Sequence, residues 1–195
     1  ELVARYGLEG KKTIVCVGRL VHRKGQDRLI EAMPRIVEAF PEAALLLVGE
    51  GPYKKKLLDL VKKHKMEKYV RFVGRVQYSE LPAHIQLGDI FAMPSRSRFF
   101  GLEVEGLGIV YLEASSCGVP VIAGASGGAP DAVIPGETGV VVDGDDAGAI
   151  ARATIDLMSS PQLRASMSKH GREWAIAEWN WTLWGERFSA LLLGE

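Results

Sequence analysis

The chain has 195 residues, 47% of them hydrophobic, which is enough to bury one sizeable core and favours one large domain over two small ones. Its 24 basic and 24 acidic side chains give a formal net charge of zero, which argues against nucleic acid or an anionic membrane as the main partner. The two cysteines, Cys16 and Cys117, lie far apart in ordinary apolar segments, so we predict reduced core residues of a cytoplasmic protein rather than a disulfide or a metal pair.

Short apolar runs rich in Val, Ile and Leu alternate along the chain with segments of helical period. Continuous apolar runs are typical of strands that are buried on both faces of a parallel sheet. The predicted strands are 13–17, 44–48, 70–73, 90–93, 119–123 and 139–142. Alternation of strand and helix, repeated about six times, predicts a doubly wound α/β domain with a Rossmann-like parallel sheet.

The segment after the last predicted strand is helical and carries all four tryptophans, Trp174, Trp179, Trp181 and Trp184. We interpret them as packing residues rather than as a surface for carbohydrate stacking. We predict one domain over residues 1–180 and a C-terminal helix over residues 181–195. Because the sheet already has helices for both faces, we expect the apolar stripe of this last helix to form an interaction surface.

The chain begins at Glu1, close to the first predicted strand, without Met and without a signal-peptide pattern. We therefore interpret it as a fragment of a longer protein. No apolar run approaches the ~20 residues that span a bilayer. These features predict a cytoplasmic location.

Glycines and charged side chains follow most of the predicted strands at the point where each strand ends. Ligands of open parallel sheets bind beyond these carboxyl ends, so we predict the functional site there. Arg19 and Lys24 follow the first strand and flank a turn that leads into a helix near Gly25. Two cations beside a helix N-terminus suit a phosphate group, because free backbone N–H groups and the helix dipole add to their charge. The alternative is that both are ordinary solvated surface cations.

Two carboxylates, Glu105 and Glu113, stand on either side of a glycine-rich helix start. If the helix begins near Gly108, Glu113 lies about 7–8 Å further along it, while Glu105 stays on the loop at its mouth. A nucleotide diphosphate sugar laid across this mouth would place its hexose near Glu105 and its ribose hydroxyls near Glu113. Its diphosphate would meet the free N–H groups of Leu107, Gly108 and Ile109. The alternative is a solvated glutamate at each end of the helix start.

Five motifs occur in the order expected of one known family. They are Gly18-Arg19-Leu20, Arg23-Lys24-Gly25, the segment from Glu105 to Glu113, the segment from Gly118 to Ala123, and the segment from Gly127 to Asp131. In these motifs, and over essentially its whole length, the chain resembles the C-terminal domain of family-4 retaining glycosyltransferases of GT-B fold. Asp131 departs from the pattern, because many relatives have glutamate there, and we assign it no role.

The resemblance implies that this chain is the donor-binding half of a retaining glycosyltransferase. Its diphosphate site would use Gly18, Arg19 and Lys24. Glu105 would be the catalytic residue at the hexose. The backbone beside it would hold the sugar and the β-phosphate through Gly106, Leu107, Gly108 and Ile109. Stabilising the charge that develops on the leaving diphosphate would be the main contribution of this half.

The same resemblance implies that Glu113 binds the ribose and that the backbone around Val76 meets the base. We expect no metal or other cofactor, since Arg19 and Lys24 would take the place of a metal cation beside the phosphates. The acidic segment from Asp143 to Asp146 could pass for a metal motif. It lies just before an Ala-rich segment, however, and we interpret it as a turn followed by a helix N-cap.

The segment from Ser97 to Gly108 is longer than the loop that is common in this family before the first glutamate. Together with Gly108 to Ala114, it resembles the mannosyltransferases that build phosphatidylinositol mannosides. That resemblance implies GDP-mannose as the donor and a phosphatidylinositol-type lipid as the acceptor. The acceptor would bind through an N-terminal domain absent from this chain, on which helix 181–195 would dock. The full-length protein would then contact the inner face of the plasma membrane peripherally.

Three alternatives stay open at this point. A family-4 hexosyltransferase that uses a UDP-sugar would share the same site, and so would a GT-B nucleotide-sugar epimerase. The third alternative is a binding module without catalysis, since a lone half cannot position an acceptor. The loop from Glu105 to Glu113 favours a transferase over an epimerase.

Overall fold

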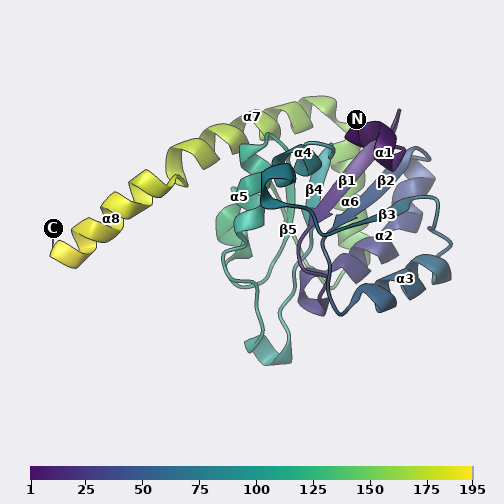
Figure 1. Cartoon of the computed structure of the whole chain (residues 1–195), viewed down its shortest axis with the longest axis horizontal. Coiled ribbons are helices and arrows are strands. Elements are labelled where there is room, and N and C mark those ends of the chain that lie inside the picture. Colours follow the sequence, from purple (N-terminus) through teal and green to yellow (C-terminus); the bar gives the residue numbers. More distant parts are fainter. Residues whose placement is uncertain (195) are drawn as a thin grey trace.

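A computed structural model describes residues 1–194 as an α/β domain built on one six-stranded parallel sheet (Figure 1). The strand order is β3-β2-β1-β4-β5-β6. The strands are β1 (Lys12–Val17), β2 (Ala43–Val48), β3 (Val70–Gly74), β4 (Ile90–Met93), β5 (Val121–Gly124) and β6 (Gly139–Val142). The predicted fold class and all six predicted strands are therefore confirmed.

The fifth strand begins later than predicted, at Val121 rather than at Val119. The amide of Val119 donates to the carbonyl of Ala114 and so closes the end of the preceding helix instead of joining the sheet. Pro120 follows, and its ring nitrogen has no hydrogen to donate to a neighbouring strand. The apolar run is thus longer than the strand that it contains.

Helices cover both faces of the sheet. The longer helices are α1 (Leu2–Tyr6), α2 (Gln26–Ala39), α3 (Lys54–Lys63), α4 (Leu81–Ile85), α5 (Ile109–Ser116), α6 (Ala147–Ser159), α7 (Pro161–Glu178) and α8 (Trp181–Leu193). Four short 3-10 helices lie in the loops: η1 (His22–Lys24), η2 (Tyr78–Glu80), η3 (Phe99–Gly101) and η4 (Ala129–Ala132). Helices α2, α3 and α6 pack together on one face, and α4, α5 and α7 pack on the other (Figure 1).

The core forms between the sheet and these two helical layers. Every residue of β2, β4 and β5 is buried, whereas the edge strands β3 and β6 are only partly buried. On α2 the buried residues recur at helical spacing and include Leu29, Met33 and Ile36. Cys16 is buried and Cys117 is half-buried, and both are free cysteines, as predicted.

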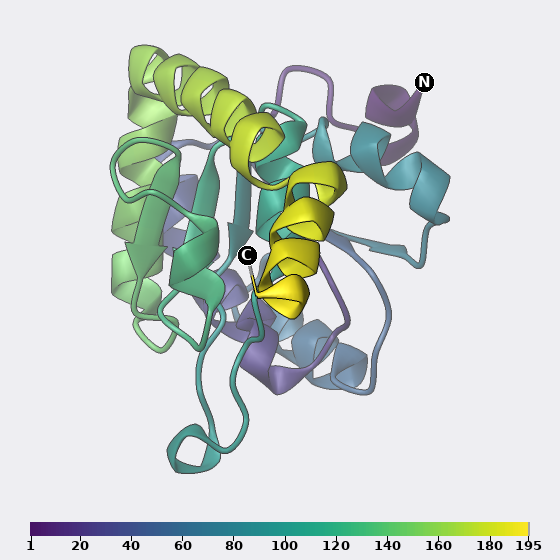
Figure 2. The ribbon, with the colours of Figure 1, turned by 90° about the vertical axis from the view of Figure 1, so that its left-hand side faces the viewer.

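The order of the strands changes direction beside β1. This strand pairs with β2 on one side and with β4 on the other, so the chain leaves β1 and β4 toward opposite edges of the sheet. A crevice opens at such a point beyond the carboxyl ends of the strands. The loop that carries η3 leaves β4 here and projects from the body of the domain (Figure 2).

Helix α8 extends away from the domain at the end of α7 (Figure 1). Within the predicted segment 181–195, α8 covers Trp181–Leu193 and ends at the C-cap Gly194, and residue 195 lies outside the described residues. No residue of α8 is buried, and its apolar side chains are exposed, among them Trp181, Phe188 and Leu191. Trp174 and Trp179, by contrast, pack against the core. The packing interpretation thus fits the first two tryptophans, and the docking of α8 stays a prediction.

Candidate functional site

The loop after β1 folds tightly over the end of β4. Helix η1 ends at Gly25, whose φ of 74° lies in the left-handed region. A Cβ atom at Gly25 would lie 1.9 Å from the carbonyl oxygen of Pro94, so a larger residue would collide with backbone. This close approach brings Arg23 and Lys24 to the loop that leaves β4.

Glu105 lies on that second loop and is only 5% exposed. Its Oε2 accepts a hydrogen bond of 2.5 Å from Nη1 of Arg23 and lies 2.8 Å from Nζ of Lys24. Burial of a carboxylate is costly unless cations or hydrogen bonds compensate it. The two cations supply that compensation, so the loop after β1 and the loop after β4 meet through Glu105.

The backbone of Glu105 is held by the loop after β5. Its amide donates to Oγ of Ser126 at 3.1 Å, and its carbonyl accepts from the amide of Gly128 at 3.2 Å. Gly127 has a φ of 53°, and a Cβ atom there would lie 1.9 Å from the carbonyl oxygen of Glu105. Gly127 and Gly128 of the fifth sequence motif therefore allow the backbone of this loop to pack closely against the backbone of Glu105.

Helix α5 begins at Ile109, shortly after Glu105 in the sequence. Gly108 is its N-cap with a φ of 71°, and a Cβ atom there would lie 2.4 Å from the ring of Tyr111. Within residues 1–194, the amides of Gly106, Leu107, Gly108 and Ile109 have no hydrogen-bond acceptor. Free amides at a helix N-terminus attract anions, and the helix dipole adds to that attraction. The arrangement suits a phosphate group.

Glu113 lies further along α5 and is half-buried. The hydroxyl of Tyr78, from η2 after β3, approaches its Oε1 at 3.5 Å. Burial raises the pKa of Glu113 above its ordinary value, and the contact with Tyr78 offsets part of that rise. Glu113 therefore has one oxygen facing Tyr78 and the other available to a ligand.

These elements enclose a cavity of about 540 Å³ at the switch point of the sheet. The residues that line it are Val17, Gly18, Arg23, Lys24, Glu105, Gly106, Leu107, Gly108, Ile109, Val110 and Glu113. The structure thus brings together eight of the ten residues proposed from the sequence, namely Gly18, Lys24, Glu105, Gly106, Leu107, Gly108, Ile109 and Glu113. Their roles toward a ligand stay predictions.

Arg19 and Val76 are the two proposed site residues that do not line this cavity. Arg19 is exposed on the rim, and its backbone carbonyl accepts a hydrogen bond from Gln26. Val76 is half-buried against the core in the loop that leads to η2. Arg19 follows the lining residue Gly18 directly in the sequence, whereas Val76 lies two positions before Tyr78, which contacts the lining residue Glu113.

Three residues that the structure places in or around the site were not proposed from the sequence, namely Arg23, Tyr78 and Arg96. Arg23 stands beside Lys24 in the second motif, so its charge was a usable signal. Tyr78 had no such signal, since its contact with Glu113 joins residues from separate elements. Arg96 had none either, because only folding brings it to Asp27.

A second, larger cavity of about 920 Å³ adjoins the first, and the two share Leu107, Ile109 and Glu113. It lies between α4, α5 and the start of α8 and is mainly apolar. Trp181 and Trp184 of α8 form part of its wall. Because its wall includes Glu113 and Tyr78, this cavity extends the Glu113 end of the site toward α8.

The acidic turn before α6 serves local structure at Asp146. Its Oδ1 accepts from the amides of Gly148 and Ala149, which confirms the predicted N-cap. Over residues 1–194, no group of three or more His, Cys, Asp or Glu side chains is placed to hold a metal ion. In the same part of the chain, no helix has the length and apolar character needed to cross a membrane.

A sequence profile described as "Glycosyl transferases group 1" matches residues 2–174. The chain belongs to this glycosyltransferase family. Among solved structures of the same fold, Anabaena Alr3699/HepE in complex with UDP superimposes with a TM-score of 0.88 over 100% of this chain and 52% of that chain, at 23% identity. The predicted GT-B affiliation of the fold is confirmed.

Two curated relatives are GDP-mannose-dependent alpha-(1-6)-phosphatidylinositol monomannoside mannosyltransferases. The protein from Mycolicibacterium smegmatis is 50% identical over 97% of this chain and 50% of its own length. The protein from Mycobacterium tuberculosis is 47% identical over 100% of this chain and 51% of its own length. The chain thus spans about half the length of these relatives.

Proposed function

We propose that this chain is the donor-binding half of a retaining mannosyltransferase that transfers mannose from GDP-mannose to a phosphatidylinositol-type lipid. One observation carries the proposal: a buried carboxylate, two cations and the free N-terminus of α5 meet in one cavity. The similarity to two GDP-mannose-dependent phosphatidylinositol monomannoside mannosyltransferases, at 50% and 47% identity, supports the choice of donor and acceptor.

The diphosphate of the donor binds between η1 and the start of α5. Lys24 and Arg23 face it from one side, and the amides from Gly106 to Ile109 face it from the other. Gly18 leaves room beside the phosphates, and Arg19 reaches them from the rim. Charged hydrogen bonds of this kind stabilise the negative charge that grows on the leaving diphosphate.

Glu105 binds a hydroxyl group of the hexose at the mouth of α5 and is the proposed catalytic residue. In the reaction, the bond from the anomeric carbon to the diphosphate oxygen breaks. A new bond forms from the same carbon to the acceptor oxygen on the same face of the sugar. The proton of the acceptor hydroxyl passes to an oxygen of the leaving diphosphate, so the reaction needs no further reactant.

The nucleoside end of the donor lies along α5 toward η2. Glu113 accepts hydrogen bonds from the ribose hydroxyls, because a carboxylate can accept from two neighbouring hydroxyls at once. The base lies against the backbone around Val76, with the exposed ring of Tyr78 beside it. The donor then extends from Glu105 to Tyr78 across the two adjoining cavities.

Charge compensation in this proposal comes from the chain itself. Arg23, Lys24, Arg19 and the dipole of α5 together face the diphosphate. A divalent metal ion is therefore not needed for donor binding. A titration of GDP binding with EDTA and with excess magnesium tests this point.

The acceptor is proposed to bind through another part of the whole protein. Relatives are about twice as long as this chain, and α8 presents an exposed apolar stripe on which such a part can dock. We propose that the whole protein acts in the cytoplasm and contacts the inner face of the plasma membrane peripherally, where it meets its lipid acceptor.

Calorimetry with this chain and with GDP, UDP and ADP tests the donor half of the proposal. Tighter binding of GDP than of UDP or ADP supports it, whereas preference for UDP points to a hexosyltransferase that uses a UDP-sugar. Transfer is then measured with the whole protein, GDP-[¹⁴C]mannose and phosphatidylinositol-type lipids. Conversion of UDP-N-acetylglucosamine without any acceptor would replace the transferase by an epimerase.

A further inference from the structure

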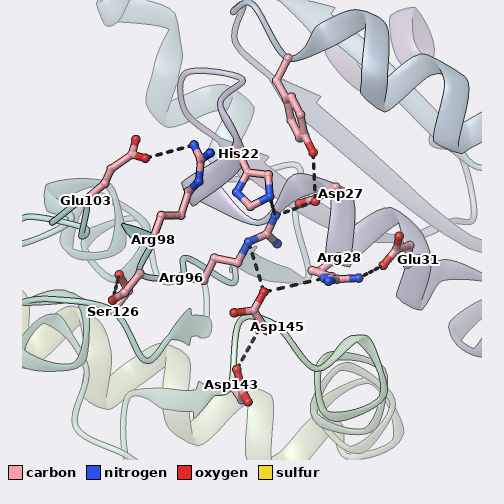
Figure 3. A network of polar contacts seen from close by, with 12 residues as sticks. His22, Asp27, Arg28, Glu31, Arg96, Arg98, Glu103, Ser126, Asp143 and Asp145 are labelled. Carbon is pink, nitrogen blue, oxygen red and sulfur yellow. Dashed lines mark hydrogen bonds and ion pairs between the residues drawn. The ribbon is translucent and has the colours of Figure 1, made fainter. Parts of the chain in front are cut away.

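Arg96 is a buried arginine at the start of the loop that leads from β4 to Glu105. Its side chain is only 3% exposed. One nitrogen, Nη2, donates to Oδ2 of Asp27 at 2.6 Å and to Nε2 of His22 at 2.8 Å (Figure 3). A second nitrogen, Nε, lies 3.3 Å from Oδ1 of Asp145. One guanidinium therefore contacts two stretches that are far apart in the sequence, the first containing His22 and Asp27 and the second containing Asp145.

The partners of Arg96 lie on three different elements, and one of these elements, η1, lines the donor cavity. His22 begins η1, which carries Arg23 and Lys24, and Asp27 lies in the first turn of α2. Asp145 lies in the acidic turn before α6. The backbone adds a further link, since the amide of Arg96 donates to the carbonyl of Arg23 at 2.8 Å.

Tyr53 contacts two members of this cluster and helps to fix its geometry. The hydroxyl of Tyr53 donates to the same Oδ2 of Asp27 at 3.3 Å, and its ring meets the ring of His22 edge-on at 5.5 Å. His22 accepts from Arg96 at Nε2, so its ring is neutral with the proton on Nδ1. A buried cation that is paired with two carboxylates and hydrogen-bonded at a ring nitrogen has little freedom to move.

Arg96 does not line the donor cavity, so it cannot contact a nucleotide sugar there directly. Its contacts instead hold η1 through the ring of His22 and the carbonyl of Arg23. Arg23 and Lys24 approach Glu105 from η1, and the loop that begins at Arg96 ends at Glu105. The position of the Arg96 side chain thus affects both the cations of η1 and the loop that carries Glu105.

We propose that Arg96 is a positioning residue, which fixes η1 through His22 and Asp27 and so holds Arg23 and Lys24 at the donor diphosphate. Asp145 of the acidic turn forms a second ion pair with Arg96. This turn therefore has a role beyond the N-cap at Asp146. The inference rests on the proposed function, because it requires that the cavity binds a nucleoside diphosphate.

The first test compares GDP and guanosine as ligands of this chain. Arg96→Met should weaken GDP binding roughly tenfold or more, which corresponds to ~1.4 kcal/mol. Guanosine has no phosphate group, so its affinity, measured by ligand-observed NMR, should change less than twofold. A general loss of structure would weaken both ligands together. The ratio of the two affinities therefore separates positioning from unfolding.

The second test needs no ligand. The amides of Lys24 and Gly25 donate to the carbonyls of Val21 and His22, so their hydrogen exchange reports on the order of η1. Arg96→Met should speed exchange at both amides while exchange in β1 and β2 stays unchanged. This measurement distinguishes failure of the inference from failure of the proposed function, because it holds even for a chain that binds no GDP.

Two further variants guard against misfolding, since Arg96→Met leaves Asp27 buried without its cation. The pair Arg96→Met with Asp27→Asn removes both charges and keeps an acceptor for Tyr53, so it should fold and still bind GDP weakly. Asp145→Asn, at a half-exposed position, should fold normally and show a smaller loss in the same direction. Arg152→Met is the matched control, because Arg152 pairs with Asp146 at the surface, outside the Arg96 cluster.

The outcomes are decisive in either direction. Selective loss of GDP affinity together with faster exchange at Lys24 and Gly25 supports the inference. Wild-type GDP affinity in the folded pair Arg96→Met with Asp27→Asn would overturn it, and so would unchanged exchange in η1. Equal losses in Arg152→Met would also overturn it, because the effect would then follow from net charge alone.

Discussion

Nζ of Lys24 lies 2.8 Å from Oε2 of Glu105, inside the cavity at the switch point of the sheet. The side chains are only 11% and 6% exposed, so this ion pair is well shielded from solvent. A donor diphosphate that enters the cavity must share Lys24 and Arg23 with Glu105. In the proposed function, donor binding would therefore change the charged contacts of the Glu105 carboxylate.

The first prediction concerns the cations at the diphosphate. Lys24→Ala and Arg23→Ala should each weaken GDP binding by about 1.5–3 kcal/mol, the range for a hydrogen bond to a charged group. Arg19→Ala should weaken it less, because Arg19 is exposed on the rim. Calorimetry measures the affinity, and circular dichroism checks the fold. Unchanged affinity in both Lys24→Ala and Arg23→Ala would contradict the proposed diphosphate site.

The second prediction separates the two carboxylates. Glu113→Gln should weaken GDP binding, because it loses the charge that accepts from the ribose hydroxyls. Glu105→Gln should leave GDP binding unchanged or tighten it, since Glu105 then no longer competes with the phosphates for Lys24. The same change should lower transfer by the whole protein. Equal loss of GDP affinity in both variants would rule out this division of roles.

The third prediction is a pH dependence of stability that comes from His22. Burial, then the Arg96 cation, lower the pKa of His22 below its ordinary value of 6.5, so the folded chain keeps the ring neutral. The stabilisation is present above pH 6.5 and is lost as the pH falls below that value, because the unfolded chain then binds the proton first. Urea unfolding from pH 8 to pH 5 should show this loss in the wild type and a smaller loss in His22→Gln.

The fourth prediction concerns metal ions. GDP affinity should stay within tenfold, or ~1.4 kcal/mol, between EDTA and excess magnesium. The reason is that cationic side chains and the N-terminus of α5 already face the phosphates. The titration is done by calorimetry at constant ionic strength, so that screening does not differ between the two samples. A larger gain in GDP affinity with magnesium would mean that the cationic side chains do not compensate the diphosphate charge by themselves.

The fifth prediction concerns α8. Its exposed stripe, which includes Trp181, Phe188 and Leu191, should become protected from hydrogen exchange when the other half of the protein is present. The isolated chain should bind GDP but transfer no mannose, because the acceptor and a closed cleft both need that other half. Transfer by the isolated chain at the rate of the whole protein would defeat this idea. Protection of α8 that the other half does not change would defeat it too.

Local features of the sequence were sufficient to predict the elements of this fold. The apolar run of each strand lies within a few neighbouring residues, so six strands could be located without knowing what they pack against. The helix start at Gly108 was predictable for the same reason, because glycine and the following apolar residues mark it locally. So was the N-cap at Asp146, since its partners are the next few amides.

The contacts that build the site were decided only by the tertiary structure. Arg23 and Glu105 are 82 positions apart, and Asp27 and Arg96 are 69 apart, so no local pattern relates them. They meet because β1 and β4 are neighbours in the sheet, an order that depends on the packing of the whole domain. The sequence thus determined which charged residues follow each strand, and the strand order determined which of these charges form pairs, because burial requires each of them to have a partner.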